Sequence, residues 1–253
     1  MALAEIGKVD ILGMDACLMG MAEVAYEVKD YVTYIIASEE TEPGDGYTYD
    51  GFLSKLQANP TMEPLALAKT VAQVYIQHYQ TTGDGSTQAV IKANYMDGFL
   101  KAVNEFAYAL NKVGDINLMK NAASKAQSFA ISDNKDLYHF ALLIYSSTND
   151  NDLKTKAKAL MDYIKNKLIA WHGYTNSEGG WWGPTDYSNS YGIAIYIPSY
   201  SIADGYEELK WAKYSNWDEL LKWYLGAKTS DNTNTIPQTQ QTTPWYEWLF
   251  GNK

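Results

Sequence analysis

Residues 8–37 read KVDILGMDACLMGMAEVAYEVKDYVTYIIA, and this stretch decides the fold class. Residues 8–14 form a short apolar run closed by turn residues, which is typical of a buried strand. Residues 18–30 carry apolar side chains at a helical period, and residues 31–37 are β-branched and aromatic. A strand, a helix and a strand within about 30 residues make a βαβ unit. We therefore predict an α/β fold with a mostly parallel sheet flanked by helices.

Regular patterns continue to about residue 228, and we predict one domain over residues 1–228. Further strands are predicted at 87–93, 168–174 and 190–197. Amphipathic segments predict helices at 59–81, 96–112, 117–129, 136–145, 152–166 and 217–225. Residues 38–50, SEETEPGDGYTYD, have turn chemistry and predict a loop. Residues 229–244 are rich in Thr, Asn and Gln, which indicates a polar linker before a short aromatic tail at 245–253.

Composition and charge exclude several classes of function. Thirty acidic against twenty basic residues give a net charge of −10, and every basic residue is lysine. Proteins that read nucleic acids depend on basic faces and on bidentate arginine, so we expect no DNA or RNA partner. The single cysteine excludes a disulfide framework and a four-cysteine zinc site. No apolar run approaches about 18 residues, so no membrane span is expected.

Cys17 is the candidate nucleophile. It directly follows a predicted strand, and open α/β sheets carry their sites at the carboxyl ends of strands. It also lies at the start of the predicted helix, where the helix dipole would favour the thiolate. The alternative is that Cys17 is a lone buried cysteine that packs as a small apolar residue.

Residues 9–20, VDILGMDACLMG, together with residues 23–26 resemble the nucleophile segment of the clostripain family of cysteine peptidases, which belong to the caspase-like clan. The resemblance continues through SEETEPGDG at 38–46 and, more weakly, at 190–198 and 217–221. It implies a caspase-like peptidase domain in which a cysteine attacks a peptide carbonyl. It further implies cleavage after a basic residue, arginine especially, and a bacterial protein that is secreted or held at the cell surface.

The resemblance assigns roles to three residues. Cys17 becomes the nucleophile, Asp15 lies in the pocket for the substrate's basic side chain, and Asp45 forms a second acidic wall. Carboxylates suit a guanidinium because charge-assisted hydrogen bonds are strong in a partly dry slot. The alternative for Asp15 is a helix N-cap, and the alternative for Asp45 is a plain turn former.

The histidines depart from the family pattern. In the family, the catalytic histidine precedes the nucleophile, but His78, His139 and His172 all follow Cys17. Only His172, at the end of a predicted strand, could reach the site. We therefore expect a heavy-chain-like, C-terminal part of a peptidase whose N-terminal strands are missing. The histidine would lie on an upstream light-chain segment that stays associated, and the chain alone would be inactive.

Three alternatives stay open. The carboxylates of residues 38–50 could bind calcium, on which clostripain depends, but a solvated acidic loop is the better interpretation; they are Glu39, Glu40, Glu42, Asp45 and Asp50. No metal ligand can be named from this. A degenerate peptidase could act as a non-catalytic peptide-binding module. A carbohydrate-binding module could use the aromatic segment at 179–187, although core and loop packing explains those aromatics better.

Overall fold

The computed structural model describes residues 2–179 and 183–226. Its main sheet has four strands in the order β1-β2-β3-β5, which are β1 (Val9–Gly13), β2 (Val32–Ala37), β3 (Ser86–Lys92) and β5 (Ile169–Thr175). A second, two-stranded sheet pairs β4 (Asn134–Asp136) with β6 (Ala194–Tyr196). The predicted linker at 229–244 and tail at 245–253 lie outside the described residues.

The main sheet is mixed. β1 and β2 are parallel and are joined by a helix, as the βαβ pattern predicts. β3 is antiparallel to both of its neighbours, β2 and β5, so β1, β2 and β5 share one direction. The α/β fold with a sheet flanked by helices is confirmed, but only one of the three strand pairs is parallel. The predicted strand at 190–197 is shorter than expected and pairs with β4, away from the main sheet.

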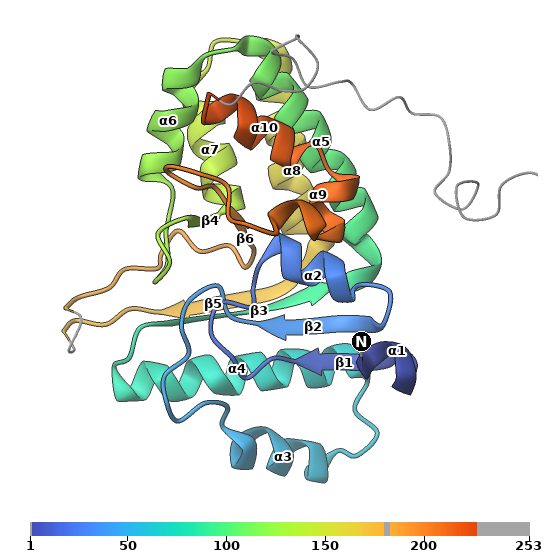
Figure 1. Ribbon diagram of the computed structural model, residues 1–253. Coiled ribbons are helices and arrows are strands. Elements are labelled where there is room, and N and C mark those ends of the chain that lie inside the picture. The colour runs from blue at the N-terminus through green and yellow to red at the C-terminus, as the bar shows by residue number, and fades with distance from the viewer. Residues whose placement is uncertain (1, 180–182, 227–253) are drawn as a thin grey trace, which may run out of the picture.

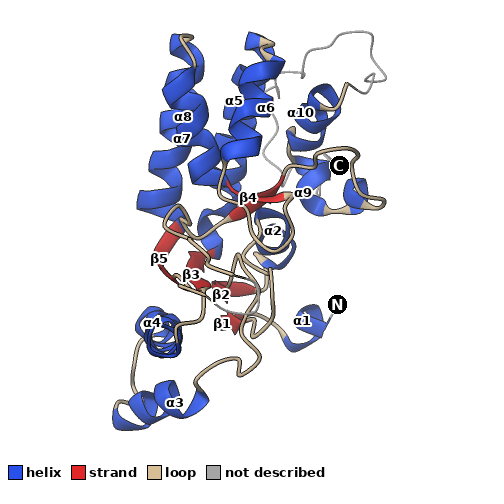
Figure 2. Ribbon diagram, turned by 90° about the vertical axis from the view of Figure 1, so that its left-hand side faces the viewer, coloured by secondary structure: helices blue, strands red, loops and turns tan. Residues whose placement is uncertain are grey.

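Helices cover both faces of the sheet (Figures 1 and 2). Helices α3 (Tyr49–Ala58) and α4 (Pro64–Thr82) lie on one face, and α4 packs along the strands. The other face carries α2 (Ala22–Val28), α5 (Met96–Val113), α6 (Ile116–Lys125), α7 (Leu137–Ser147), α8 (Asn151–Tyr163), α9 (Lys210–Tyr214) and α10 (Trp217–Tyr224). Short turns complete the fold: α1 (Ala2–Ile6), η1 (Ala93–Tyr95), η2 (Ile164–Leu168) and η3 (Tyr206–Glu208). None of the described helices combines the length and apolar composition that a bilayer span requires.

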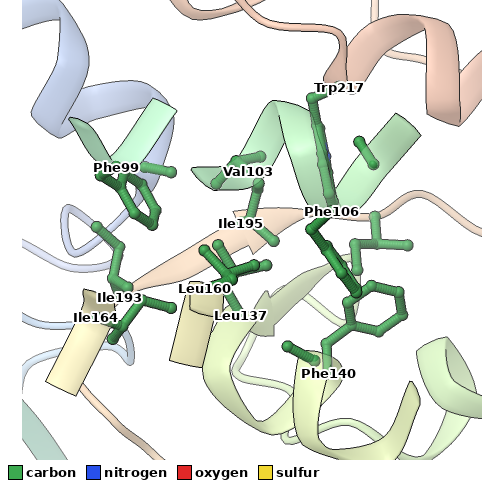
Figure 3. Packing of buried hydrophobic residues seen from close by; sticks show 14 of the residues in the cluster. Phe99, Val103, Phe106, Leu137, Phe140, Leu160, Ile164, Ile193, Ile195 and Trp217 are labelled. Atoms are coloured by element: carbon green, nitrogen blue, oxygen red, sulfur yellow. The ribbon is translucent and has the colours of Figure 1, made fainter. Parts of the chain in front are cut away.

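The central strands bury side chains on both faces. Ile35 faces the larger core beneath α5, α7 and α10, whereas Ile36 faces α4 with Tyr75 and Tyr79. This alternation follows from the period of two along a strand. The larger core is built from aromatic and branched side chains of several helices (Figure 3). Trp217 is fully buried there, so at least one of the tryptophans, all of which lie after residue 170, serves the core.

Candidate active site

Cys17 lies on the loop that joins β1 to α2, at the carboxyl end of β1, and its thiol is free and exposed. Exposure contradicts the alternative that Cys17 is a buried apolar residue. The predicted position at a helix N-terminus is wrong, because α2 begins only at Ala22. Residues 18–20 instead pair with the continuation of β2, since Leu18 N–H donates to the Glu40 carbonyl (3.1 Å) and Gly20 N–H to the Ser38 carbonyl (2.7 Å).

Close packing fixes the path of this loop. A Cβ at Gly20 would lie 2.8 Å from backbone atoms of both Ser38 and Glu39, so only glycine fits. Leu18 adopts a φ of 63°, a left-handed conformation that is uncommon for a side chain of this kind. The Cys17 loop is therefore held in a defined shape by the segment that follows β2.

That segment also contacts the sulfur. The backbone N–H of Glu42 donates to Cys17 Sγ at 3.3 Å. The acidic loop at 38–50 therefore reaches the candidate nucleophile directly.

Asp15 is anchored by the same loop. Its carboxylate accepts hydrogen bonds from the Tyr47 N–H (3.0 Å) and the Tyr49 hydroxyl (2.9 Å). A Cβ at Gly46 would lie 2.7 Å from Asp15 Oδ1, so this approach requires glycine. The helix N-cap alternative is wrong, because the N-cap of α2 is Met21.

Glu42 is the residue that sequence reasoning missed at this site. Its carboxyl faces that of Asp15 and accepts from Gln88 Nε2 at 3.1 Å. Burial and the neighbouring Asp15 raise the pKa of Glu42 to about 8. The sequence placed Glu42 in the acidic loop, but nothing in the local pattern showed that its side chain turns toward Asp15.

Asp45 is exposed in a tight turn, in which Gly46 N–H donates to the Pro43 carbonyl at 2.9 Å. Within residues 2–179 and 183–226, no hydrogen bond joins Asp45 to Asp15. The pKa of Tyr79 is raised to about 12, mainly because the hydroxyl is buried and next because of the negative charge of Asp45. The structure thus places Asp45 near the site on the same loop, in a position compatible with either of its two predicted roles.

A pocket of about 230 Å³ adjoins Asp15 on the α4 side of β1. Its walls are almost wholly apolar and aromatic, and Asp15 is the one charged residue among those that line it; the others are Ile11, Gly13, Ile36, Tyr47, Tyr49, Phe52, Leu67 and Val71. A slot of this kind, with one carboxylate among apolar walls, is suited to a long side chain with a charged end.

The three histidines lie away from Cys17. His78 is on α4 beside Tyr79, and His139 on α7 accepts from the Gln127 N–H at 2.9 Å. His172 lies on β5, and two strands separate β5 from β1. No hydrogen bond or ring contact within residues 2–179 and 183–226 joins any of them to Cys17. The structure therefore does not bring His172 to the nucleophile.

The acidic loop is solvated only in part, because Asp45 and Asp50 are exposed whereas Glu39 and Glu40 are buried, which corrects the sequence-based interpretation for those two residues. Glu39 and Glu40 are 1% and 3% exposed. Glu39 accepts from the Gly192 N–H (3.0 Å), and Glu40 accepts from the Ala130 N–H (3.1 Å). Across the described part of the chain, no three or more His, Cys, Asp or Glu side chains are grouped to hold a metal ion.

The fold is that of the caspase-like cysteine proteases, with a mixed sheet flanked by helices and the cysteine loop at the end of β1. The chain belongs to the clostripain family, whose sequence model matches residues 1–224. No curated protein matches the chain.

Several solved structures share the fold. A Bacteroides fragilis cysteine protease is 21% identical with a TM-score of 0.62, over 85% of this chain and 90% of that one. A clostripain from Bacteroides thetaiotaomicron, in complex with the peptide inhibitor BTN-VLTK-AOMK, is 18% identical with a TM-score of 0.64, over 85% and 91%. An inactive zymogen C11 protease from Parabacteroides distasonis is 19% identical with a TM-score of 0.63, over 82% of this chain and 59% of that one.

Proposed function

We propose that this chain is the heavy-chain-like part of a cysteine endopeptidase that cleaves after arginine or lysine, with Cys17 as the nucleophile. One observation carries the proposal: the exposed Cys17 and the anchored Asp15 lie two residues apart on a loop that residues 42–49 hold in place. This arrangement places a thiol and a carboxylate on one loop at the carboxyl end of β1.

The reaction follows from this arrangement. The Cys17 thiolate attacks the peptide carbonyl and forms an acyl-enzyme, the leaving amine takes a proton from a histidine, and water then releases the acid product. Backbone N–H groups of the Cys17 loop are candidates to stabilise the oxyanion. The Glu42 N–H donates to Sγ at 3.3 Å and so helps to fix the position of the sulfur before attack.

The histidine comes from an upstream light-chain segment in this proposal. β1 is an edge strand of the described sheet, and Val9, Ile11 and Leu12 on it are only half-buried. An edge strand offers unpaired N–H and C=O groups to a further strand. A strand paired there in parallel with β1 would end near the Cys17 loop, which is where the reaction requires the base.

Specificity rests on Asp15 and Asp45. Asp15 is the charged residue that lines the 230 Å³ pocket, and Asp45 adds a second negative charge on the neighbouring turn. The related Bacteroides thetaiotaomicron clostripain is described with an inhibitor whose peptide letters, VLTK, end in K. A further relative is described as a secreted C11 protease, which supports secretion of this chain.

The experiment combines the chain with its upstream segment, digests a protein mixture and maps the new chain ends by mass spectrometry. We expect arginine or lysine immediately before almost every cleaved bond. Cleavage after other residues would contradict the specificity. The absence of cleavage with both parts present would contradict the activity itself.

The second candidate is a non-catalytic peptide-binding module, which is favoured by the separation of all three described histidines from Cys17. Such a module would bind basic peptides equally well with and without the upstream segment, and would never cleave them. A carbohydrate-binding module would instead bind glycans in the Cys17→Ala variant as well as in the parent. Peptide titration and glycan titration distinguish the two.

A further inference from the structure

Glu40 is a buried acid that the proposed roles of Cys17, Asp15 and Asp45 leave unused. It is 3% exposed, and it lies two residues before Glu42, whose N–H contacts the sulfur of Cys17. A buried carboxylate is costly unless hydrogen-bond donors surround it. The donors that Glu40 binds therefore indicate which parts of the chain it holds together.

One oxygen of Glu40 binds two backbone donors. Its Oε1 accepts from the Thr41 N–H at 2.6 Å and from the Ala130 N–H at 3.1 Å. Ala130 lies in the loop before β4, 90 residues further along the chain. The carboxylate therefore joins the segment after β2 to a loop that is remote in the sequence.

The peptide group between residues 40 and 41 transmits this constraint to the Cys17 loop. Its N–H donates to Oε1 of Glu40, and its carbonyl accepts from the Leu18 N–H at 3.1 Å. Because a peptide group is planar, fixing its N–H also fixes the direction of its carbonyl. The Glu40 carboxylate therefore orients the carbonyl that holds Leu18, the residue directly after Cys17.

Leu18 has a conformation that requires such support. Its φ of 63° is uncommon for a residue with a side chain and persists only where the surroundings hold it. The Leu18 side chain packs against a cluster that contains Phe129 and Tyr187, whose rings stack at 6.2 Å. Phe129 directly precedes Ala130, so the hydrogen bond from Ala130 to Glu40 also helps to place this cluster beside Leu18.

A second anchor of the same segment ends at Glu40. Thr87 on β3 is 1% exposed, and its Oγ1 accepts from the Glu40 N–H at 3.1 Å. The Glu40 carboxylate extends this anchoring to Thr41, toward the Glu42 N–H that donates to Cys17 Sγ. The rigid part of β3 is thereby connected to the sulfur through Glu40.

We propose that Glu40 is a positioning residue for Cys17: its carboxylate, held by the Ala130 N–H, orients the peptide group that fixes Leu18 and with it the Cys17 thiol. Glu40 acts through Leu18 rather than on the reacting atoms. The role depends on the reach of the side chain and on its acceptor oxygen, and not on its negative charge. This inference rests on the proposed function for the reaction of Cys17, but its first test does not require cleavage.

Two variants separate reach from charge. Glu40→Gln keeps the length and the acceptor oxygen, whereas Glu40→Asp keeps the charge but is one methylene too short to reach the Ala130 N–H. Amide hydrogen exchange of the folded chain, followed by NMR, compares Leu18 with the strand β2 as an internal reference. We expect Glu40→Asp to speed exchange at Leu18 about five- to tenfold relative to β2, the effect of one net hydrogen bond, and Glu40→Gln to stay within about twofold of the parent.

Glu39→Asp is the matched control, because it shortens the adjacent and similarly buried acid, whose carboxylate binds the Gly192 N–H instead. It should leave the Leu18 rate relative to β2 at the parent value. Ala130→Pro, at an exposed loop position, deletes the donor and replaces Glu40→Asp if that variant does not fold; it should also speed exchange at Leu18. An unmoved Leu18 rate, a Glu40→Gln variant that behaves like Glu40→Asp, or an equal effect of Glu39→Asp would overturn the proposal.

Peptidase assays with the upstream segment provide the second readout. Glu40→Asp should lower kcat for an arginyl substrate about ten- to a hundredfold, the effect of a misplaced reacting group. KM should stay unchanged, because Asp15 is held separately by Tyr47 and Tyr49, and Glu40→Gln should restore kcat. An unchanged kcat, or a loss in KM instead, would overturn the role of Glu40. The expected exchange pattern without any cleavage by the parent would refute only the proposed function.

Discussion

Glu23 allows a stability prediction with a worked magnitude. It lies on α2, 5% exposed, and its Oε1 accepts from the Tyr196 N–H (3.1 Å) and the Tyr206 hydroxyl (2.9 Å). Burial raises its pKa from 4.5 to about 7. Between these two pH values the folded chain keeps a proton that the unfolded chain has lost. Stability therefore falls as the pH rises through this window, by about 3 kcal/mol in total at 1.36 kcal/mol per pKa unit.

Glu23→Gln removes this titration while keeping the shape and the acceptor oxygen. We expect the variant to match the parent near pH 4.5 and to be about 3 kcal/mol more stable than the parent at pH 8. Urea unfolding at several pH values measures the difference, and Glu5→Gln on the exposed face of α1 is the control. Parallel curves of unfolding free energy against pH for the parent and Glu23→Gln would refute the reasoning.

Three further predictions concern the site. In the enzyme assembled with its upstream segment, Asp15→Asn should lower kcat/KM for arginyl substrates about ten- to a hundredfold, since a hydrogen bond to a charged group contributes roughly 1.5–3 kcal/mol. Equal loss on uncharged substrates would mean that Asp15 only positions Cys17. Asp45→Asn should lower arginyl cleavage in the same sense, whereas a plain turn former would show no change. Gly20→Ala should cost about 1–3 kcal/mol in urea unfolding, because its methyl group would lie 2.8 Å from backbone atoms; an unchanged unfolding midpoint would contradict that packing.

Local patterns in the sequence were sufficient for the βαβ unit and for most helices. Strand β2, with Ile35 and Ile36 facing opposite cores, follows directly from its β-branched run. Helix α2 starts later than its periodicity predicts, because Leu18 and Gly20 pair with the segment after β2. That pairing is tertiary and has no local signal.

The same holds for the candidate site: features set by local sequence could be predicted, and features set by tertiary contacts could not. The sequence placed Cys17 and Asp15 at the carboxyl end of a strand, and the structure brings them together with the acidic loop. The sequence could not show that Glu39 and Glu40 are buried, because their partners, Gly192 and Ala130, lie 153 and 90 residues further along the chain. The orientation of the Glu42 side chain likewise depends on a contact with β3.

The most direct test of the central claim is intact-mass spectrometry of the chain, quenched during turnover of an N-blocked arginine ester in the presence of the upstream segment. The account predicts a transient acyl adduct on Cys17, absent from Cys17→Ala, together with loss of turnover in that variant. An adduct on another residue, or turnover by Cys17→Ala near the parent rate, would contradict it.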